Sequence, residues 1–455
     1  MVDYMRSSDA FTWSMESDPR LRSTVVTVII LDRSPDWAAV CERFEVISRT
    51  VTMFRKRVVG SVFPAPPRWE YAPDFDLKYH MRRVTAPKPG TLDVVLEMAR
   101  LAAMADFDRA RPLWEVTLIE GLKGRGAAVL CRFHHALTDG VGGVQIATTL
   151  FDTSAHPRAL EHASPAKESG ARHWLSDYFD AARYDAALIT NALVASVKNA
   201  PTLMVNSVLR PAEAVSSAVA LTASVYRTVR PVNRTGSTLM TRRTLTRRLG
   251  VLEVPRPQLR SAGHVGGGTL NDAFVAGVAG GLRRYHEKHG ISVGDLHLTM
   301  PISLRTEADE IGGNHVTLMR FDVPVGCADP ADRVAQIHAA ADKVRHEKSL
   351  PYTQLIAGAL NLMPRWYIGS ILRHVDFLAS DVPGIPVPVY LCGARVQTQY
   401  AFGPTIGAAV NVTLLTYVDT CTLGIDVDTG AIPDYDEFYD CLVAGFDEVL
   451  ALAPD

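Results

Sequence analysis

Residues 113–140 read LWEVTLIEGLKGRGAAVLCRFHHALTDG, and this stretch decides how the first third of the chain folds. Two runs rich in β-branched and other apolar residues, 114–120 and 127–133, flank the turn-rich segment GLKGRG. Two such runs separated by a short glycine-containing segment predict a β-hairpin. The second run leads directly into His134 and His135, so we expect both histidines at the end of a strand.

The segment HHALTDG is the strongest chemical signal in the sequence. A strand that ends in a loop can hold an imidazole rigidly beside a channel, and the unperturbed pKa of histidine suits proton abstraction near neutral pH. His135 is therefore our candidate general base. Asp139 could act beside the ring or turn away and anchor the loop, while Gly140 removes side-chain bulk at the turn.

Three other interpretations compete for the histidine pair. Two histidines at a strand end can be purely structural. A metal would obtain at most three ligands from HHxxxD, which is not the HExxH pattern, so we expect no metal. A Ser-His-Asp hydrolase would need a nucleophile elbow GxSxG, and we expect no such segment in the sequence.

Outside the hairpin, the first third of the chain mixes strands with helices. Residues 23–31, STVVTVIIL, are dense in β-branched residues and predict a buried strand. Residues 36–50 and 91–107 carry apolar side chains at helical spacing. After Gly140, the later part of GVGGVQIATTLFD also suits a helix.

A polar stretch and an arginine-rich run separate the two halves of the chain. Residues 152–172 are rich in Ala, Ser, Pro and His and predict a linker, and residues 174–226 predict a mostly helical arm. Residues 227–248 carry seven arginines, and no acidic residue occurs between Glu213 and Glu253. This run is either a solvated face or a docking site for an anionic group such as a phosphate or an anionic lipid.

The second half repeats the mixture of strands and helices. Thr269 with Asp272 in capping-box position, and Gly290 as a stop, predict a helix between them. Further strand and helix candidates follow it to the end of the chain. We therefore predict an α/β fold with two similar layers around a linker and arm. The predicted N-terminal domain, linker with helical arm, and C-terminal domain are 1–155, 156–240 and 241–455.

The composition excludes several classes of protein. The net charge of the 455-residue chain is −2, which offers no global field for nucleic acid. The six cysteines are scattered without a CxxC pair, so we expect core thiols rather than disulfides or a zinc site. The first twenty residues carry charges throughout, unlike a secretory signal, and no uncharged apolar run reaches the roughly 18 residues of a membrane span. We expect a cytoplasmic protein, or one that at most lies on a membrane face.

HHALTDG resembles the HHxxxDG motif of the CoA-dependent acyltransferase superfamily. Further segments resemble one branch of it, the bacterial wax ester synthase/diacylglycerol acyltransferase family, in order and spacing from about residue 4 to 450. They are a PLW segment at Pro112, Leu113 and Trp114, an ND helix at Asn271 and Asp272, MPISLR followed by GGNHVTL, and SDVPGIPVPVYLCGARV. Two departures occur: SDVPG has Asp where the family has Asn, and DFDRARPLW stands where Leu-Asp is commoner.

The resemblance implies two CoA-dependent-acyltransferase-like domains, each a mixed sheet with flanking helices, that form a pseudo-dimer around a central channel. His135 would lie midway along this channel. Acyl-CoA would enter from one face as co-substrate and a lipid alcohol from the other. His135 would take the hydroxyl proton as the oxygen attacks the thioester, with no covalent acyl-enzyme, no cofactor and no metal.

The resemblance also implies roles for neighbouring residues. His134 would shape the catalytic loop rather than act as the base. Asn271 would donate to the developing oxyanion, or else would cap its helix together with Asp272.

The remaining residues of the matched motifs support the site. Asp139 would need a cation, and Arg305 is the candidate partner; otherwise Arg305 is a surface or CoA-binding residue. Which arginine pairs with Asp139 stays open. The PLW residues are expected along the substrate channel: Pro112, Leu113 and Trp114.

The expected activity is transfer of a fatty acyl group from acyl-CoA to a lipid hydroxyl, forming triacylglycerol from diacylglycerol or wax ester from a long-chain alcohol. The alternative is a catalytically weak homologue that binds or carries lipid, and the intact His135 and Asp139 argue against it. We expect no nucleic-acid partner, and peripheral contact with the inner membrane face or lipid droplets. Acyl length, the acceptor and the oligomeric state stay open. It also stays open whether the arginine-rich run contacts CoA, a membrane or only solvent.

Overall fold

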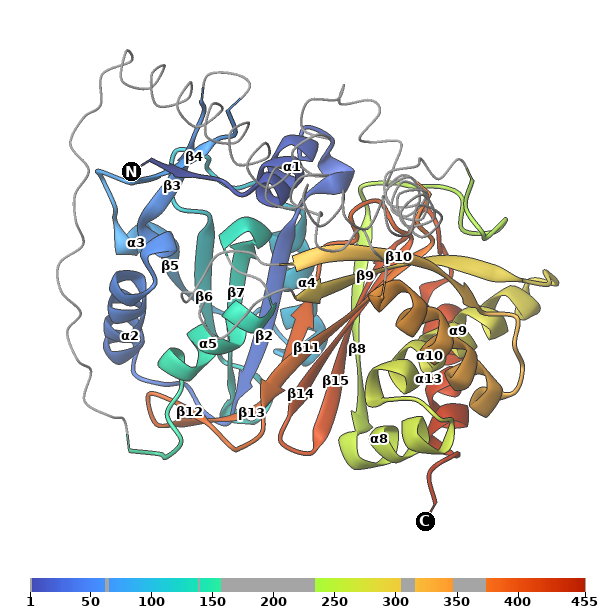
Figure 1. Ribbon diagram of the computed structural model, residues 1–455. Coiled ribbons are helices and arrows are strands. Elements are labelled where there is room, and N and C mark those ends of the chain that lie inside the picture. The colour runs from blue at the N-terminus through green and yellow to red at the C-terminus, as the bar shows by residue number, and fades with distance from the viewer. Residues whose placement is uncertain are drawn as a thin grey trace, which may run out of the picture.

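The computed structural model describes residues 2–61, 65–137, 140–156, 234–303, 316–346 and 374–454. Two six-stranded mixed sheets lie next to each other at its centre, with helices packed against them (Figure 1). A small third sheet contains the short strands β1 (Asp3–Tyr4), β4 (Arg68–Tyr71) and β3 (Lys56–Val59). The predicted α/β fold with two domains is confirmed.

The N-terminal sheet has the strand order β12-β13-β2-β7-β6-β5. Its strands are β2 (Thr24–Leu31), β5 (Met81–Thr85), β6 (Trp114–Glu120), β7 (Ala127–His134), β12 (Tyr390–Leu391) and β13 (Ala394–Phe402). The predicted hairpin is confirmed, because β6 pairs antiparallel with β7 and brings Trp114 opposite Phe133.

Both faces of the N-terminal sheet are covered. On β2, Val26 and Val28 belong to the core beneath α4 (Leu92–Met104), whereas Ile29 and Leu31 belong to the core beneath α2 (Trp37–Thr50). This two-sided burial explains why the strand is an almost continuous apolar run. The other short helices of this half are α1 (Ser7–Met15), α3 (Leu77–His80), α5 (Gly140–Leu150), and the 3-10 turns η1 (Pro19–Leu21), η2 (Thr52–Arg55) and η3 (Lys123–Arg125).

The C-terminal sheet has the strand order β10-β9-β11-β14-β15-β8. Its strands are β8 (Arg247–Pro255), β9 (Asp295–Ser303), β10 (Val316–Pro324), β11 (Phe377–Ile385), β14 (Val410–Tyr417) and β15 (Thr420–Asp428). One face packs on a helical layer that Figure 1 shows at the right. That layer contains α8 (Arg256–Val265), α9 (Leu270–Lys288), α10 (Pro330–Arg345) and α13 (Tyr435–Leu450).

Helix α9 is the central helix of this layer, and its predicted boundaries are confirmed. The Thr269 side chain accepts a hydrogen bond from the backbone N–H of Asp272, and the Asp272 carboxylate accepts one from the N–H of Thr269, which completes the capping box. Gly290, just after the helix, has a φ of +69°. Almost every side chain of α9 up to Leu282 is buried.

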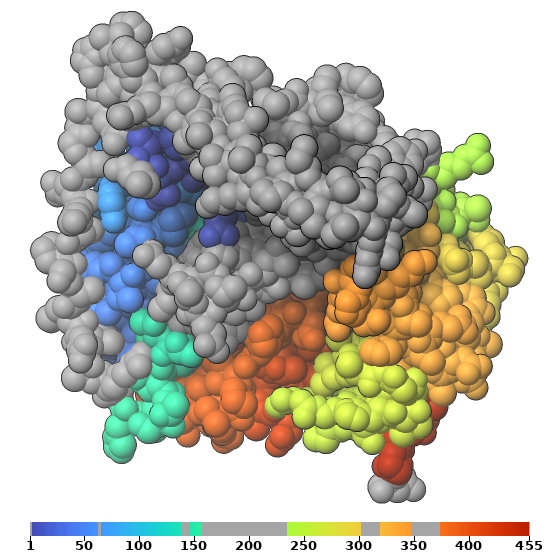
Figure 2. All heavy atoms as spheres, in the orientation of Figure 1, coloured from blue at the N-terminus to red at the C-terminus, as the bar shows by residue number. Residues whose placement is uncertain are grey.

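Strand β13 crosses from the second half of the chain into the N-terminal sheet. It pairs antiparallel with β2, with Phe402 opposite Val26. The predicted range 241–455 assigned residues 390–402 to the C-terminal domain, whereas β12 and β13 of this stretch belong to the N-terminal sheet. The reason is that apolar alternation shows that a segment is a strand, but not which strand it pairs with. In Figure 2 the orange and red atoms of this later part of the chain fill the lower middle of the molecule.

The two sheets meet where β13 lies against β8 and β15. Thr422 Oγ1 donates to the carbonyl oxygen of Gln399 at 2.6 Å, and the Tyr400 hydroxyl donates to a Glu253 carboxylate oxygen at 2.6 Å. At Gly424 the two backbones come so close that a Cβ would lie 1.9 Å from the carbonyl oxygen of Ala401. Only glycine allows this approach.

Several predicted features lie outside the described residues. These are most of the linker and helical arm, together with Asp139 and Arg305. Among the helices that are described, none is both long enough and apolar enough to cross a membrane.

Replacing Gly424 with Ala should force the two sheets apart or distort both strands. Overpacking of this kind costs about 1–3 kcal/mol, so we expect a clearly lower melting temperature. Scanning calorimetry would measure it. Gly294→Ala is the matched control, since a Cβ at Gly294 meets no atom within 4 Å. Equal melting temperatures for the two variants would contradict the close backbone contact.

Candidate active site

The backbone fixes the turn that carries His134 and His135. His134 is the last residue of β7, and the 3-10 turn η4 (His135–Leu137) follows at once. The N–H of His134 donates to the carbonyl oxygen of Leu113 at 3.0 Å, and the N–H of His135 donates to that of Ser23 at 2.8 Å. The residues just before β6 and just before β2 thus hold the histidine pair from both sides.

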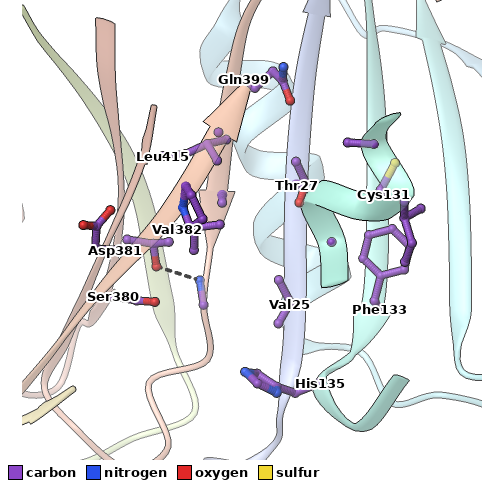
Figure 3. Close-up of a pocket in the computed structure, with 18 of the residues that line it drawn as sticks. Val25, Thr27, Cys131, Phe133, His135, Ser380, Asp381, Val382, Gln399 and Leu415 are labelled. Atoms are coloured by element: carbon purple, nitrogen blue, oxygen red, sulfur yellow. Dashed lines mark hydrogen bonds between the residues drawn. The ribbon is translucent and has the colours of Figure 1, made fainter. Parts of the chain in front are cut away.

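His135 lines a cavity of about 220 Å³ between the two sheets (Figure 3). On β2, the side chains of Val25, Thr27 and Ile29 line it, on the face opposite to Val26 and Val28. The other wall comes from the C-terminal domain, chiefly β11, β14 and the loop after β13. Helix α5 completes the cavity with Gly143, Ile146, Ala147 and Leu150.

Most of the cavity lining is apolar, and its polar groups come mainly from the C-terminal strands. Asn411 and Thr413 alternate on β14 with Val412 and Leu414, which point into the helical layer. Asn411 Nδ2 donates to the carbonyl oxygen of Pro404 at 2.8 Å. Thr413 Oγ1 accepts a hydrogen bond from the N–H of Gly403 at 3.1 Å. A cavity that is mostly apolar, with a few fixed polar groups and an imidazole, suits a ligand with a hydrocarbon chain and a reactive polar group at one end.

The SDVPG segment forms part of this wall through a local irregularity in β11. The pairing with β14 shifts register between Val382 and Ile385. The N–H of Gly384 donates to Thr416 Oγ1 at 2.9 Å, and a Cβ on Gly384 would overlap the carbonyl oxygen of Thr416. Glycine is thus required where the strand bulges beside the cavity.

His134 occupies a different environment from His135. Its side chain is fully buried, its Nε2 lies 2.9 Å from a carboxylate oxygen of Glu16, and its Nδ1 accepts a hydrogen bond from the N–H of Ala136 at 3.0 Å. Burial by itself would raise the pKa of Glu16. The hydrogen bond from His134, the N–H of Ser23 and the charge of Arg109 instead hold this pKa below its ordinary value. His134 therefore belongs to the frame of the turn, and His135 faces the cavity.

The prediction that the PLW residues line the substrate channel is wrong. Pro112, Leu113 and Trp114 are all buried, and the last two have no exposed surface. The indole N–H of Trp114 donates to the carbonyl oxygen of Phe54 at 2.8 Å, and its ring stacks on His80. The segment is a core element: it packs the start of β6, the partner strand of β7.

The structure places Asn271 on the far side of the C-terminal sheet from the cavity. Asn271 Nδ2 lies 3.7 Å from the sulfur of Met300, which packs in the core beneath the helices, whereas the next residue, Pro301, lines the cavity. Asp272 caps α9 and also lies 2.8 Å from Nδ1 of His338. The capping interpretation thus holds for Asp272, whereas Asn271 contacts Met300 in place of a role in the cap or at the cavity.

The remaining predictions concern Asp139, Arg305, Gly140 and the GxSxG pattern. Asp139 and Arg305 lie outside the described residues, and Gly140 is the first residue of α5. The expectation that no GxSxG segment occurs is wrong, because residues 290–294 read GISVG. This segment connects α9 to β9, however, which is the reverse of the strand-to-helix context of a nucleophile elbow.

Sequence reasoning missed Glu16 and the polar groups of β14. In VNVTLLTY, the alternation of Asn411 and Thr413 with buried aliphatic residues predicts a polar face on a buried strand, and this signal was available. No comparable signal marks Glu16, because its buried partner His134 is 118 residues away in the sequence.

Asp381 is the unusual ionisable group of this wall. Figure 3 shows its carboxylate on the side of β11 away from His135. Solvent reaches the side chain, but the surrounding protein is dense, and this burial raises the pKa of Asp381 to about 6.

Asp381→Asn should therefore stabilise the protein in a pH-dependent way. An unfolded chain has an Asp pKa of about 3.9, so the folded state binds more protons between roughly pH 4 and 6 and loses stability as the pH rises through that window. The gain in melting temperature of the variant should grow from pH 4.5 to about 6.5 and then level off. Thermal unfolding at a series of pH values measures it, and a gain independent of pH would contradict the raised pKa.

Comparisons with known proteins agree on one family. The model of the wax ester synthase/diacylglycerol acyltransferase catalytic domain matches residues 5–274, and that of the C-terminal domain of this family matches residues 312–449. A Mycobacterium tuberculosis H37Rv protein, named as a diacylglycerol O-acyltransferase, is 36% identical over 450 residues, which cover 96% of this chain and 90% of that protein.

Solved structures show the same fold. The wax ester synthase/diacylglycerol acyltransferase from Marinobacter aquaeolei VT8 has a TM-score of 0.64 at 20% identity, with 99% of each chain covered. A starter condensation domain of rhizomide synthetase, in complex with C8-CoA and Leu-SNAC, has a TM-score of 0.62 at 14% identity, with 100% of this chain and 95% of that chain covered. The chain belongs to the wax ester synthase/diacylglycerol acyltransferase family.

Proposed function

We propose that this protein transfers a fatty acyl group from acyl-CoA to the hydroxyl of a lipid acceptor, either diacylglycerol or a long-chain alcohol. The observation that carries the proposal is the position of His135, an imidazole at an apolar cavity between two domains of an acyltransferase fold. The relative from M. tuberculosis and the complex with C8-CoA support this acceptor class and this donor class.

In the proposed reaction, the imidazole of His135 removes the proton of the acceptor hydroxyl. The oxygen then attacks the thioester carbonyl carbon, the bond from carbon to sulfur breaks, and the CoA sulfur leaves with the proton from the imidazolium. A positioned base contributes about 10²–10⁴-fold to such a step. The apolar lining from β2 and α5 would hold the hydrocarbon and exclude the water that would otherwise hydrolyse the thioester.

The only thiol that lines the described cavity is a poor nucleophile. Cys131 lies on β7, and burial raises the pKa of Cys131 to about 12. At neutral pH the thiol is protonated, and nucleophilic attack requires the thiolate. Direct transfer to the acceptor is therefore favoured over an acyl-cysteine intermediate.

A protein that only binds or carries lipid would use the same cavity without chemistry. The two candidates differ in one measurement, the release of free CoA thiol from palmitoyl-CoA with and without an acceptor. We expect release that depends on added diacylglycerol or hexadecanol, and a panel of acceptors in this assay would rank them.

Replacing His135 with Ala should lower turnover by about two decades or more while the melting temperature stays close to wild type, because the lost group acts as a base. The thiol-release assay measures it. Cys131→Ala should retain turnover within a few-fold if no acyl-cysteine forms. Near-wild-type turnover in His135→Ala would refute the base, and inactivity of a folded Cys131→Ala would point to a covalent route.

We further propose that the protein works at an anionic lipid surface, through the arginine-rich run. Three arginines of this run have partners within the protein, and we exclude them as contacts for the lipid surface. Arg243 donates to the carbonyl oxygens of Gly407 and Val375, and the two that follow pair with acids: Arg247 with Asp426 and Arg248 with Asp436. The two other arginines of the run among the described residues, Arg234 and Arg242, are exposed and remain as candidates.

Sedimentation with vesicles should show binding that rises with the fraction of anionic lipid and falls with salt, since each surface arginine contributes about 1 kcal/mol near such a membrane. The double variant Arg234→Glu/Arg242→Glu should bind more weakly. Binding that ignores both lipid charge and salt would exclude an electrostatic surface contact.

A further inference from the structure

The carboxylate of Glu16, just after the end of α1, lies at the centre of a closed hydrogen-bond network around the catalytic turn. One of its oxygens, Oε1, accepts from the N–H of Ser23 at 2.8 Å and lies 2.9 Å from Nε2 of His134. Ser23 in turn accepts the N–H of His135, and His134 accepts the N–H of Ala136. Both branches of this network, through Ser23 and through His134, end within one residue of His135.

The partners of His134 determine which of its ring nitrogens carries the proton. Nδ1 accepts from the N–H of Ala136 at 3.0 Å, so Nδ1 has no hydrogen of its own and Nε2 carries it. Nε2–H then donates to Glu16. The other tautomer, or a protonated ring, would bring an N–H of the imidazole against the N–H of Ala136 and open the turn.

Because His134 and Glu16 are both buried, loss of their hydrogen bond would be costly. His134 has no exposed surface and Glu16 is 9% exposed, so neither group can exchange its partner for water at low cost. The ring of Trp13 meets His134 edge-on at 5.3 Å, and the guanidinium of Arg109 stacks on Trp13 and lies 3.5 Å from the second Glu16 oxygen. The negative charge of Glu16 is thus balanced from the outer, solvent-accessible side.

We propose that Glu16 is a positioning residue for the acyl transfer of the preceding section, on which this inference rests. By holding His134 in the Nε2–H tautomer, Glu16 fixes the backbone on both sides of His135 and thereby aims the imidazole into the cavity. Glu16 reaches His135 only through other groups, and it does not line the cavity. Its loss should therefore lower kcat and leave KM for acyl-CoA nearly unchanged.

Three variants separate hydrogen bonding from charge and from general damage. Glu16→Ala removes the acceptor. Glu16→Gln keeps an oxygen that can accept from both Ser23 and His134, and the half-exposed Arg109 can move away from the new amide. Asp18→Ala is the matched control, because Asp18 is an acid two residues further along that forms an ion pair with Arg20.

We expect Glu16→Ala to lower kcat about 10–100-fold, with a change in KM below about three-fold, and Glu16→Gln to recover most of the loss. Asp18→Ala should behave as wild type. A folded Glu16→Ala variant with wild-type kcat would overturn the assignment. So would a Glu16→Gln variant as impaired as Glu16→Ala.

A second measurement keeps this inference separate from the proposed function. Long-range ¹H–¹⁵N spectra of histidine-labelled protein should show a neutral Nε2–H tautomer for His134, assigned by its loss in His134→Ala, and should show it retained in Glu16→Gln but not in Glu16→Ala. If the wild type transfers no acyl group, the proposed function fails, while the spectra still test the network. If the wild type is active and the Nδ1–H tautomer is found, the inference alone fails.

Discussion

The contact between β13 and β15 is the constraint on which the rest of the structure depends. At Gly424 the backbones of the two sheets touch, and Thr422 and Tyr400 add hydrogen bonds between the sheets close to that point. Sheets that touch at one place and carry their ordinary twist must diverge elsewhere. The space between β2 and β11 is where they diverge, and there the structure has a cavity with His135 beside it. The crossing of β13 into the N-terminal sheet is thus what locates the site.

Local patterns predicted the elements well, and they could not predict the long-range pairings. The hairpin before His134 and the capping box of α9 are encoded within a few residues each, and both were confirmed. The pairing of β13 with β2 joins residues more than 360 positions apart, and alternation of apolar residues carries no information about partners. The PLW segment failed for a related reason: a recurrent sequence does not say whether its side chains face a substrate or the core. Trp114 has no exposed surface and its N–H is satisfied by Phe54.

The sequence predicted the histidine of the candidate site, but only part of the cavity wall and of the residues that hold the histidine. A histidine at the end of a strand is a local feature, and the structure places His135 at the cavity. The wall that faces it is built from β11 and β14, and its polar positions follow from the two-residue period of VNVTLLTY once the buried face is known. Glu16 has no such pattern, since its role depends on two partners, Ser23 and His134, of which one is 118 residues away.

Two adjacent histidines of the same chemistry come to differ because one is enclosed and the other is not. His134 is enclosed by Glu16, Trp13 and the N–H of Ala136, which fixes its ring, while His135 is left to face the cavity. The frame around the proposed base belongs entirely to the N-terminal domain, whereas most of the opposite wall, including Asp381 and Thr413, belongs to the C-terminal domain. Residues that shape the acceptor and acyl positions can therefore change on one side of the cavity without disturbing the turn on the other. Asp381 in SDVPG, for example, lies on the wall opposite the turn that carries His135.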